Sequence, residues 1–332
     1  MSATAMAGTP SSLTHTIEPA ARAQHTSGMP SPIPPKRTYK SYFSDSTRWD
    51  RYVPRDDDIV ITTPPKVGTT WTQRITSVLV FQDTALPGTL LEASPWLECA
   101  FVPFEAIQAG LEQQRHRRFL KSHLPADGMP FHPQVSYLVV GRDLRDAAVS
   151  THNHAFGLNG VLTQPLWVDE DEEAHTPHQP TVPADIHPFW RDYFTRSAFP
   201  WESDGWPYNS PTHHLSSWWA HRDRENVLFL HYEDMLADLD REMRRVSDFL
   251  GIPVDESIWP GLVKACLFSD MKSQKVGLFG AEMNQMLSKF DFFHEGRNGQ
   301  WHEVFAPEEL TLFRAAEARL PDDLRAWLTR SP

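Results

Sequence analysis

Residues 63–71 (TPPKVGTTW) combine residue types that suit the binding of an anion. They lie between an expected strand and an expected helix, where free backbone N–H groups and the helix dipole attract negative charge. Gly68 lets the backbone approach an oxyanion closely, Thr69 and Thr70 add hydroxyl groups, and Lys66 adds a positive charge. An ordinary strand-to-helix turn with a capping threonine fits the same residues, so this segment alone leaves both interpretations open.

A second candidate anion site is the segment 141–150 (GRDLRDAAVS). Arg142 and Ser150 are eight residues apart, which is a little over two helical turns. An arginine at a strand exit and a serine two turns later can therefore approach the same anion. The alternative is that Arg142 pairs with Asp143 or Asp146 on the helix surface.

His123, in the segment 119–125 (FLKSHLP), is the candidate general base. A neutral imidazole near pH 7 can accept a proton from an attacking hydroxyl. Lys121 lies two residues earlier on an extended chain, so its side chain is expected on the same face as His123. His152 and His154 do not indicate a metal site, because a spacing of two on a helix puts them on divergent sides.

Short apolar runs that alternate with helical patterns position these residues. Strands are predicted at residues 59–63, 135–140 and 227–230. Helices are predicted across Trp71 to Leu79, at residues 144–156 and at residues 240–250. This alternation predicts an α/β fold with a mostly parallel central sheet flanked by helices, and with sites at the carboxyl ends of the strands.

The chain is expected to form one domain over residues 37–332. Residues 1–36 are rich in Ser, Thr, Ala and Pro and are predicted to be a disordered tail. The regular pattern is absent from residues 157–211, which indicates an irregular insertion that forms either a lid or a disordered insert. The acidic run at 169–173 within it is expected to be solvated surface. Residues 273–295, which include Gly277 and Gly280, are expected to form a mobile lid.

Composition narrows the possible partners. The formal net charge of −12 argues against binding nucleic acid or an anionic membrane surface, so an anionic ligand needs local positive groups. Only two cysteines are present, which suggests neither a disulfide framework nor a thiolate zinc site. No apolar run reaches the roughly 20 residues of a membrane span and no secretory signal is recognisable, so we expect a cytoplasmic protein.

Three of these segments resemble motifs of the cytosolic PAPS-dependent sulfotransferases, where PAPS is 3′-phosphoadenosine 5′-phosphosulfate. The segment PPKVGTTW resembles the 5′-phosphosulfate loop of that family, YPKSGTTW, with Val67 in place of serine. The segment GRDLRDAAVS is similar to RNPKDVAVS, which implies that Arg142 and Ser150 hold the 3′-phosphate. The segment KSHLP is similar to KTHLP, which implies that His123 is the catalytic base.

Three later blocks extend the resemblance to the adenosine. HYEDM resembles YEDM and implies that Tyr232 lies near the adenosine, while CLFSDMK resembles TSFKEMK and implies that Phe268 stacks on adenine opposite Trp71. FFHEGRNGQWHEVF resembles RKGxxGDW but lacks its Arg-Lys pair, so we hypothesise that Arg297 supplies the missing charge. The expected donor-binding residues are Lys66, Val67, Gly68, Thr69, Thr70, Trp71, Arg142, Ser150, Tyr232, Phe268, Met271, Gly296 and Arg297.

The resemblance implies a P-loop-like sulfotransferase fold and a metal-free transfer of a sulfuryl group from PAPS to an acceptor hydroxyl, with His123, Lys66 and Lys121 as catalytic residues. The product is 3′-phosphoadenosine 5′-phosphate (PAP). The acceptor is expected to be a small molecule whose identity does not follow from the sequence. The aromatic candidates for acceptor contacts are Phe81, Phe101, Phe104 and Trp167.

Two other functions compete with this one. A P-loop nucleotide kinase is disfavoured because Lys66 precedes Gly68 and no GxxxxGK[ST] motif is present. A non-catalytic phosphoadenosine-binding module would keep the phosphate segments but could dispense with His123. The oligomeric state is open, because the family's dimerisation stretch KxxxTVxxxE corresponds here to HEVFAPEEL, with Ala306 and Pro307 in place of Thr-Val.

Overall fold

A computed structural model describes residues 31–160, 180–287, 292–293 and 296–330 of the chain. These residues belong to one compact unit. Residues 1–30 lie outside the described part, and the boundary expected for the tail at residue 36 is too far along the chain. Ile33 exchanges backbone hydrogen bonds with Phe131, and the Lys36 N–H donates to the Asp127 carbonyl at 2.7 Å. Residues 31–36 are therefore held against the domain.

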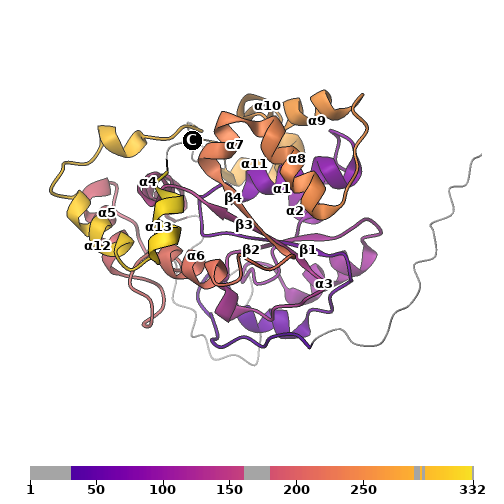
Figure 1. Ribbon diagram of the computed structural model, residues 1–332. Helices are drawn as coiled ribbons and strands as arrows, with labels where there is room; N and C mark the ends of the chain where they lie inside the picture. Colours follow the sequence, from indigo (N-terminus) through magenta and orange to yellow (C-terminus); the bar gives the residue numbers. More distant parts are fainter. Residues whose placement is uncertain (1–30, 161–179, 288–291, 294–295, 331–332) are drawn as a thin grey trace, which may run out of the picture. The chain divides into compact units, whose positions relative to one another are not determined.

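The centre of the fold is a sheet of four parallel strands (Figure 1). In chain order they are β1 (Ile59–Thr62), β2 (Phe119–Ser122), β3 (Ser136–Gly141) and β4 (Val227–His231), and their spatial order is β2-β1-β3-β4. Ile59 is in register with Phe119 on one side and Ser136 on the other, while Gly141 is opposite His231. The predicted α/β fold with a parallel sheet is confirmed.

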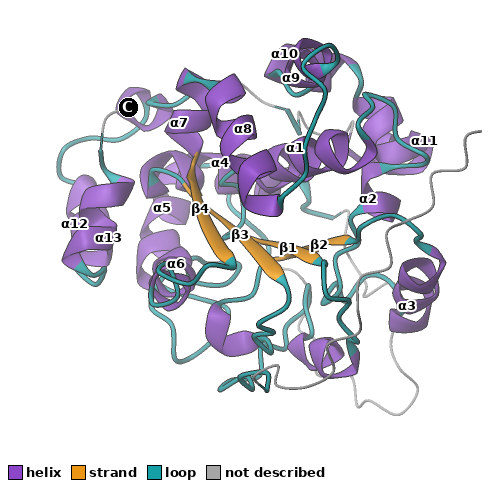
Figure 2. Cartoon of the chain, turned by 45° about the vertical axis from the view of Figure 1, so that its right-hand side comes forward, coloured by secondary structure: helices purple, strands orange, loops and turns teal. Residues whose placement is uncertain are grey.

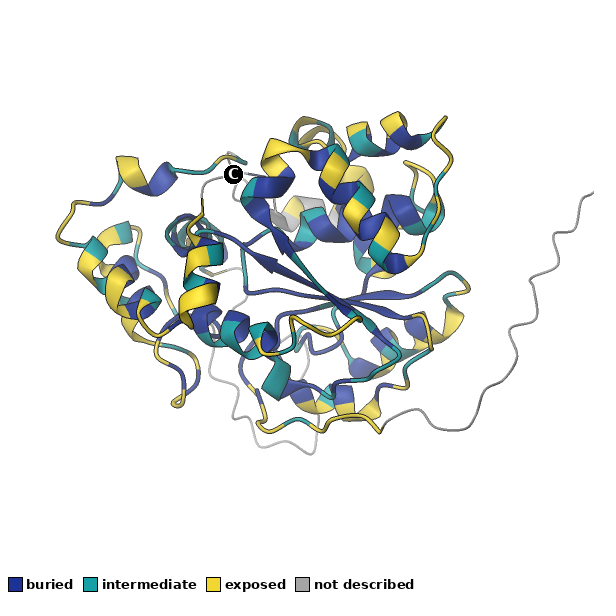
Figure 3. Ribbon diagram, in the orientation of Figure 1, coloured by how far each residue is buried: buried dark blue, intermediate teal, exposed yellow. Residues whose placement is uncertain are grey.

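Alternating side chains of the strands pack into two separate cores. Ile59, Ile61 and Leu138 face a cluster that includes α1 (Thr69–Phe81), α8 (Leu239–Leu250) and α9 (Trp259–Ala265). Val60 and Tyr137 face the other cluster, which includes α6 (Pro211–Trp219). Helices therefore lie on both sides of the sheet, and most strand residues are buried (Figures 2 and 3).

The remaining elements surround this sheet. They are η1 (Ser46–Arg51), α2 (Leu90–Ala93), α3 (Phe104–Gln113), η2 (Ala126–Gly128), α4 (Leu144–Gly157), α5 (Ile186–Thr195), α7 (Tyr232–Ala237), α10 (Phe268–Ser273), α11 (Lys275–Leu287), η3 (Gln300–Glu303), α12 (Leu310–Glu317) and α13 (Asp322–Leu328). The helices predicted at 144–156 and 240–250 match α4 and α8. The expected lid at 273–295 contains α11, which is kinked at Gly280; residues 288–291 and 294–295 lie outside the described part.

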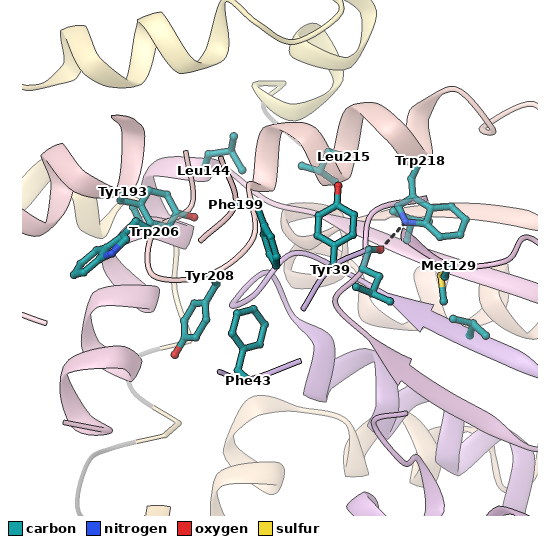
Figure 4. Packing of buried hydrophobic residues seen from close by; sticks show 14 of the residues in the cluster. Tyr39, Phe43, Met129, Leu144, Tyr193, Phe199, Trp206, Tyr208, Leu215 and Trp218 are labelled. Atoms are coloured by element: carbon teal, nitrogen blue, oxygen red, sulfur yellow. Dashed lines mark hydrogen bonds between the residues drawn. The ribbon is translucent and has the colours of Figure 1, made fainter. Parts of the chain in front are cut away.

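The prediction that residues 157–211 are irregular is wrong for α5. Phe189, Trp190 and Tyr193 of this helix are buried, and Figure 4 shows Tyr193 beside Trp206 in the aromatic core. Pro188 masked the helical pattern, although proline is tolerated in the first turn of a helix. The acidic run at 169–173 and Trp167 lie outside the described residues.

No helix in the described part of the chain combines the length and the apolar character that a membrane span requires.

The close contact between β3 and α13 gives a test of the packing. A Cβ atom added to Gly141 would overlap the ring of Trp327, which α13 places over the end of β3. Gly141→Ala should therefore lower the free energy of unfolding by about 1–3 kcal/mol, measured by urea denaturation. Gly110→Ala is the matched control, because Gly110 is an exposed position of α3 with nothing near the added atom, and the change should be neutral or stabilising. Equal stability of the two variants would contradict this packing.

Candidate active site

The residues that follow the four strands meet at one edge of the sheet. Thr62 is in register with Ser122 and with Val139, so the loop after β1 and the residue after β2 leave the sheet side by side. Arg142 and Tyr232 follow the paired residues Gly141 and His231. One cavity at this edge is lined by most of the predicted site residues, namely Lys66, Gly68, Thr69, Thr70, Trp71, Phe101, Lys121, His123, Arg142, Ser150, Tyr232, Phe268, Met271 and Gly296.

The loop before α1 is shaped to expose backbone N–H groups. Gly68 is the N-cap of α1 with φ 115°, and a Cβ atom there would lie 3.1 Å from the Tyr232 ring. Lys66 also has a left-handed backbone, with φ 67°, which a non-glycine residue adopts only when its surroundings hold it. The Val67 side chain is fully buried in the core beneath the loop, and Val67 is not among the residues that line the cavity.

Arg142 ties three segments together beneath the cavity. Its guanidinium donates to the carbonyl oxygens of Lys66 (3.3 Å) and Arg297 (3.0 Å) and to the side chain of Asn298 (3.3 Å). It lies 4.2 Å from the centre of the Tyr232 ring and is almost completely buried. Asp143 pairs instead with Arg145, and Asp146 accepts from the Gly299 N–H, so the surface ion pair considered for Arg142 is not what the structure contains.

Positive charge is concentrated where the loop before α1 lies near the end of β2. Lys66 and Lys121 both line the cavity, each with its ammonium over an aromatic ring, at 4.6 Å from Phe292 and 4.2 Å from Trp96. Burial, and then repulsion by Lys121 and Arg142, lowers the pKa of Lys66 to about 7. Burial also lowers the pKa of Lys121. Because mutual repulsion is relieved by negative charge, this cluster fits a polyanionic ligand.

His123 is oriented to act as a base. Its Nδ1 lies 2.8 Å from the Thr63 carbonyl oxygen, which can only accept a hydrogen bond, so Nδ1 carries the proton and Nε2 keeps its lone pair. Burial, and then the charge of Lys121, holds the pKa of His123 well below its ordinary value. The imidazole is therefore neutral at physiological pH and able to accept a proton.

Glu98, which no sequence motif indicated, fixes the backbone at His123. This fully buried carboxylate accepts hydrogen bonds from the His123 N–H (2.7 Å), the Ser122 hydroxyl (3.0 Å) and the Trp49 indole (2.9 Å). Burial raises its pKa. The available signal was a single acidic residue inside the otherwise apolar run 95–102 (PWLECAFV).

The aromatic part of the site is assembled from distant segments. The Trp71 indole donates to the carbonyl of Cys266 at 2.8 Å, which brings α1 next to the start of α10 and hence to Phe268. Gly296 has φ 62°, and a Cβ atom there would lie 2.5 Å from the Phe268 ring. Only glycine allows the backbone to pack on Phe268 in this way.

Arg297 does not face the cavity as hypothesised. Its guanidinium makes two hydrogen bonds with Glu303, both 2.8 Å, on the exposed side of the segment. Its backbone carbonyl instead accepts from Arg142 and from the Gln300 side chain. The backbone of Arg297 thus supports the position of Arg142, while its guanidinium pairs with Glu303.

Of the aromatic candidates for acceptor contacts, Phe101 lines the cavity. Phe81 packs on His116 (4.8 Å) and Phe104 packs under Arg51 (4.1 Å), so the structure does not bring these two to the site. The cavity is also lined by residues that sequence reasoning missed, namely Tyr42, Phe43, Trp96, Asn153, His154 and Tyr208. For His154 a signal existed, because it is four residues after Ser150 and so lies on the same face of α4.

Among the described residues, no three His, Cys, Asp or Glu side chains come together as a metal-binding group.

Comparisons with known proteins identify the family and the fold. The model of the sulfotransferase domain family matches residues 56–320. A glycolipid sulfotransferase of Mycobacterium bovis is 33% identical over 315 residues, covering 89% of this chain and 95% of the relative. Human sulfotransferase 1C2 is 26% identical over 76% of this chain and 78% of the relative.

Solved structures share the fold. The crystal structure of mouse sulfotransferase SULT7A1 complexed with PAP has a TM-score of 0.62 at 20% identity, with coverage of 89% of this chain and 98% of that one. A structure of retinol dehydratase with retinol and PAP gives a TM-score of 0.60 at 20% identity, covering 86% of each chain. The chain belongs to the sulfotransferase family.

Proposed function

We propose that this protein transfers the sulfuryl group of PAPS to a hydroxyl of a small-molecule acceptor, releasing PAP. The observation that carries the proposal is the position of His123, whose Nε2 is available as a base in the same cavity as Lys66, Arg142 and Ser150. A base beside an anion-binding edge is the arrangement that a group transfer from a nucleotide to a hydroxyl needs.

The residues of the cavity fit the donor. The N-terminus of α1, with the hydroxyls of Thr69 and Thr70, suits the 5′-phosphosulfate. Arg142 and Ser150, at the strand end and on α4, suit the 3′-phosphate, and Trp71 and Phe268 offer ring faces to the adenine. Gly296 keeps the Phe268 ring in that position.

The transfer itself uses the cations and the base. His123 Nε2 takes the proton of the acceptor hydroxyl while the acceptor oxygen forms a bond to sulfur. The bond between sulfur and the bridging oxygen of the 5′-phosphate breaks, and its electron pair stays on that oxygen. Lys66, Lys121 and the N-terminus of α1 stabilise the charge that collects there, as in a loose phosphoryl-transfer transition state.

The aromatic lining beyond His123 supports an acceptor with an apolar part. Tyr42, Phe43, Trp96 and Tyr208 surround this side of the cavity. Two relatives, from Mycobacterium bovis and Mycobacterium tuberculosis, are named glycolipid sulfotransferases, which is consistent with an acceptor that joins hydroxyl groups to an apolar body.

Removing the base tests the chemistry. His123→Ala should lower kcat by about 10²–10⁴-fold, because general base catalysis is lost, while PAP affinity changes little. Transfer of labelled sulfate from PAPS measures the rate, and calorimetric titration with PAP measures binding. His187→Ala, on the half-exposed imidazole that pairs with Glu309, is the matched control and should keep the native rate. A native rate in His123→Ala would support a different base, and binding of PAP without any transfer by the native protein would favour the non-catalytic module.

The lowered pKa of Lys66 predicts a pH dependence of donor binding. Lys66 is protonated below pH 7 and loses its charge as the pH rises, and a polyanion binds the charged form. Since the second ionisation of a phosphate is complete by about pH 7, PAP affinity should fall by up to about tenfold per pH unit between pH 7 and 9.

Lys66→Arg should flatten this profile, because arginine stays charged over the whole range. Lys264→Gln, which alters an exposed lysine paired with Asp270, should leave the profile unchanged. Calorimetric titration with PAP at several pH values measures the effect, and a native profile in Lys66→Arg would contradict the assignment.

A further inference from the structure

Trp96 contacts two of the groups to which the proposed transfer gives a role. The Lys121 ammonium lies over its ring, 4.2 Å from the ring centre. The His123 ring packs against it edge to face, with 5.2 Å between the ring centres and 82° between the planes. All three side chains line the cavity. Trp96 itself has no part in the transfer described above other than as cavity wall.

The backbone brings Trp96 to this place. Trp96 forms an isolated parallel bridge with Lys121, and the Lys121 N–H donates to the Pro95 carbonyl at 2.9 Å. The side chain of Gln73, on α1, donates to the carbonyl (3.2 Å) and the hydroxyl (3.0 Å) of Ser94 and so fixes the start of this segment. Because residues in register on neighbouring strands present their side chains on the same face, the bridge puts the indole beside the lysine side chain.

The indole ring is the contact that holds the Lys121 ammonium. In the part of the chain that the structure describes, this ammonium has the ring contact and neither a hydrogen bond nor an ion pair. Burial lowers the pKa of Lys121, so the positive charge costs free energy there. The electron-rich face of an indole attracts a cation, more strongly where water is excluded. Trp96 therefore favours the charged form of Lys121 and restricts where its flexible four-carbon chain places the charge.

An aromatic ring holds an ammonium without neutralising it. A carboxylate in the same place would cancel the charge of Lys121, whereas a ring leaves the charge and the three N–H donors of the ammonium available to an anion. The nearest buried carboxylate of this segment, Glu98, accepts instead from the His123 N–H and the Ser122 hydroxyl. The segment thus supports the base with a carboxylate and the lysine with a ring.

We propose that Trp96 is a positioning residue for Lys121, whose ammonium its ring holds in the charged form toward the 5′-phosphate of the donor. Through Lys121, the ring raises the affinity for PAP and helps to stabilise the charge that collects on the bridging oxygen during transfer. Since the same ring packs on His123, one side chain sets the spacing between the ammonium and the base. The inference rests on the proposed function, which assigns Lys121 to that oxygen.

A double-mutant cycle on the affinity for PAP tests this inference without an acceptor. Trp96→Leu keeps apolar bulk but has no ring. It should lower the affinity about tenfold, because the lysine must then be ordered at the moment of binding and its charge has lost the stabilising ring. In a Lys121→Gln background the same change should have no effect, because the charge through which Trp96 acts is absent. Calorimetric titration with PAP measures all four affinities.

Two further variants separate the ring contact from general packing. Trp96→Phe keeps an aromatic face and should restore part of the affinity in the native background, and it replaces the leucine variant in the cycle if that variant does not fold. Tyr208→Leu is the matched control. Its ring belongs to the same cavity wall and packs on Phe43 at 5.1 Å, as Figure 4 shows, so any change in PAP affinity should be the same with Lys121 and with Gln at position 121.

The outcomes distinguish this inference from the proposed function. If Trp96→Leu keeps the native affinity, or loses as much affinity in the Lys121→Gln background as in the native one, the inference is wrong and the proposed function stands. A Trp96→Phe protein that folds and binds PAP as weakly as Trp96→Leu would also overturn the inference, because an aromatic face would then make no difference. A native protein that does not bind PAP would overturn the proposed function and this inference together.

Discussion

Buried positive charge at one edge of the sheet is the constraint on which the rest of the site depends. The chain has a formal net charge of −12, yet Lys66, Lys121 and Arg142 line one cavity. Their mutual repulsion and the loss of water around them cost free energy in the folded protein, which is visible in the lowered pKa values of the two lysines. An anion that enters the cavity offsets this cost, so the charge cluster makes polyanion binding favourable before any base contact forms.

The backbone keeps these charges in place. Arg142 donates hydrogen bonds to carbonyl oxygens of the loop before α1 and of the segment before η3, so it holds the two sides of the proposed donor site together. The left-handed backbone of Lys66 is stabilised by the same contact. On the other side of β1, Glu98 and the Thr63 carbonyl fix the backbone and the ring of His123. The proposed base and the proposed anion site are thus parts of one hydrogen-bonded end of the sheet.

Local patterns in the sequence were sufficient to predict the parallel sheet and to indicate most of the proposed donor-binding residues that line one cavity. Parallel strands end at one edge, so the residues after β1, β2, β3 and β4 converge without further information. Glu98, Trp96 and Tyr208 could not be placed in this way, because their positions follow from packing between segments far apart in the chain. Arg297 shows the limit of a motif, since the motif gives a residue type at a position and the competing carboxylate of Glu303 decides where its side chain points.

The comparison of PAP with adenosine 5′-phosphate tests the central claim most directly, because the two nucleotides differ only in the 3′-phosphate that Arg142 and Ser150 are assigned to hold. Calorimetric titration of the native protein should give an affinity for PAP about 100-fold higher than that for adenosine 5′-phosphate. This is the gain expected from charge-assisted hydrogen bonds that a buried arginine and a serine donate to the 3′-phosphate. Equal affinities for the two nucleotides would contradict the account, since the charge at this edge would then have no role in recognising the donor.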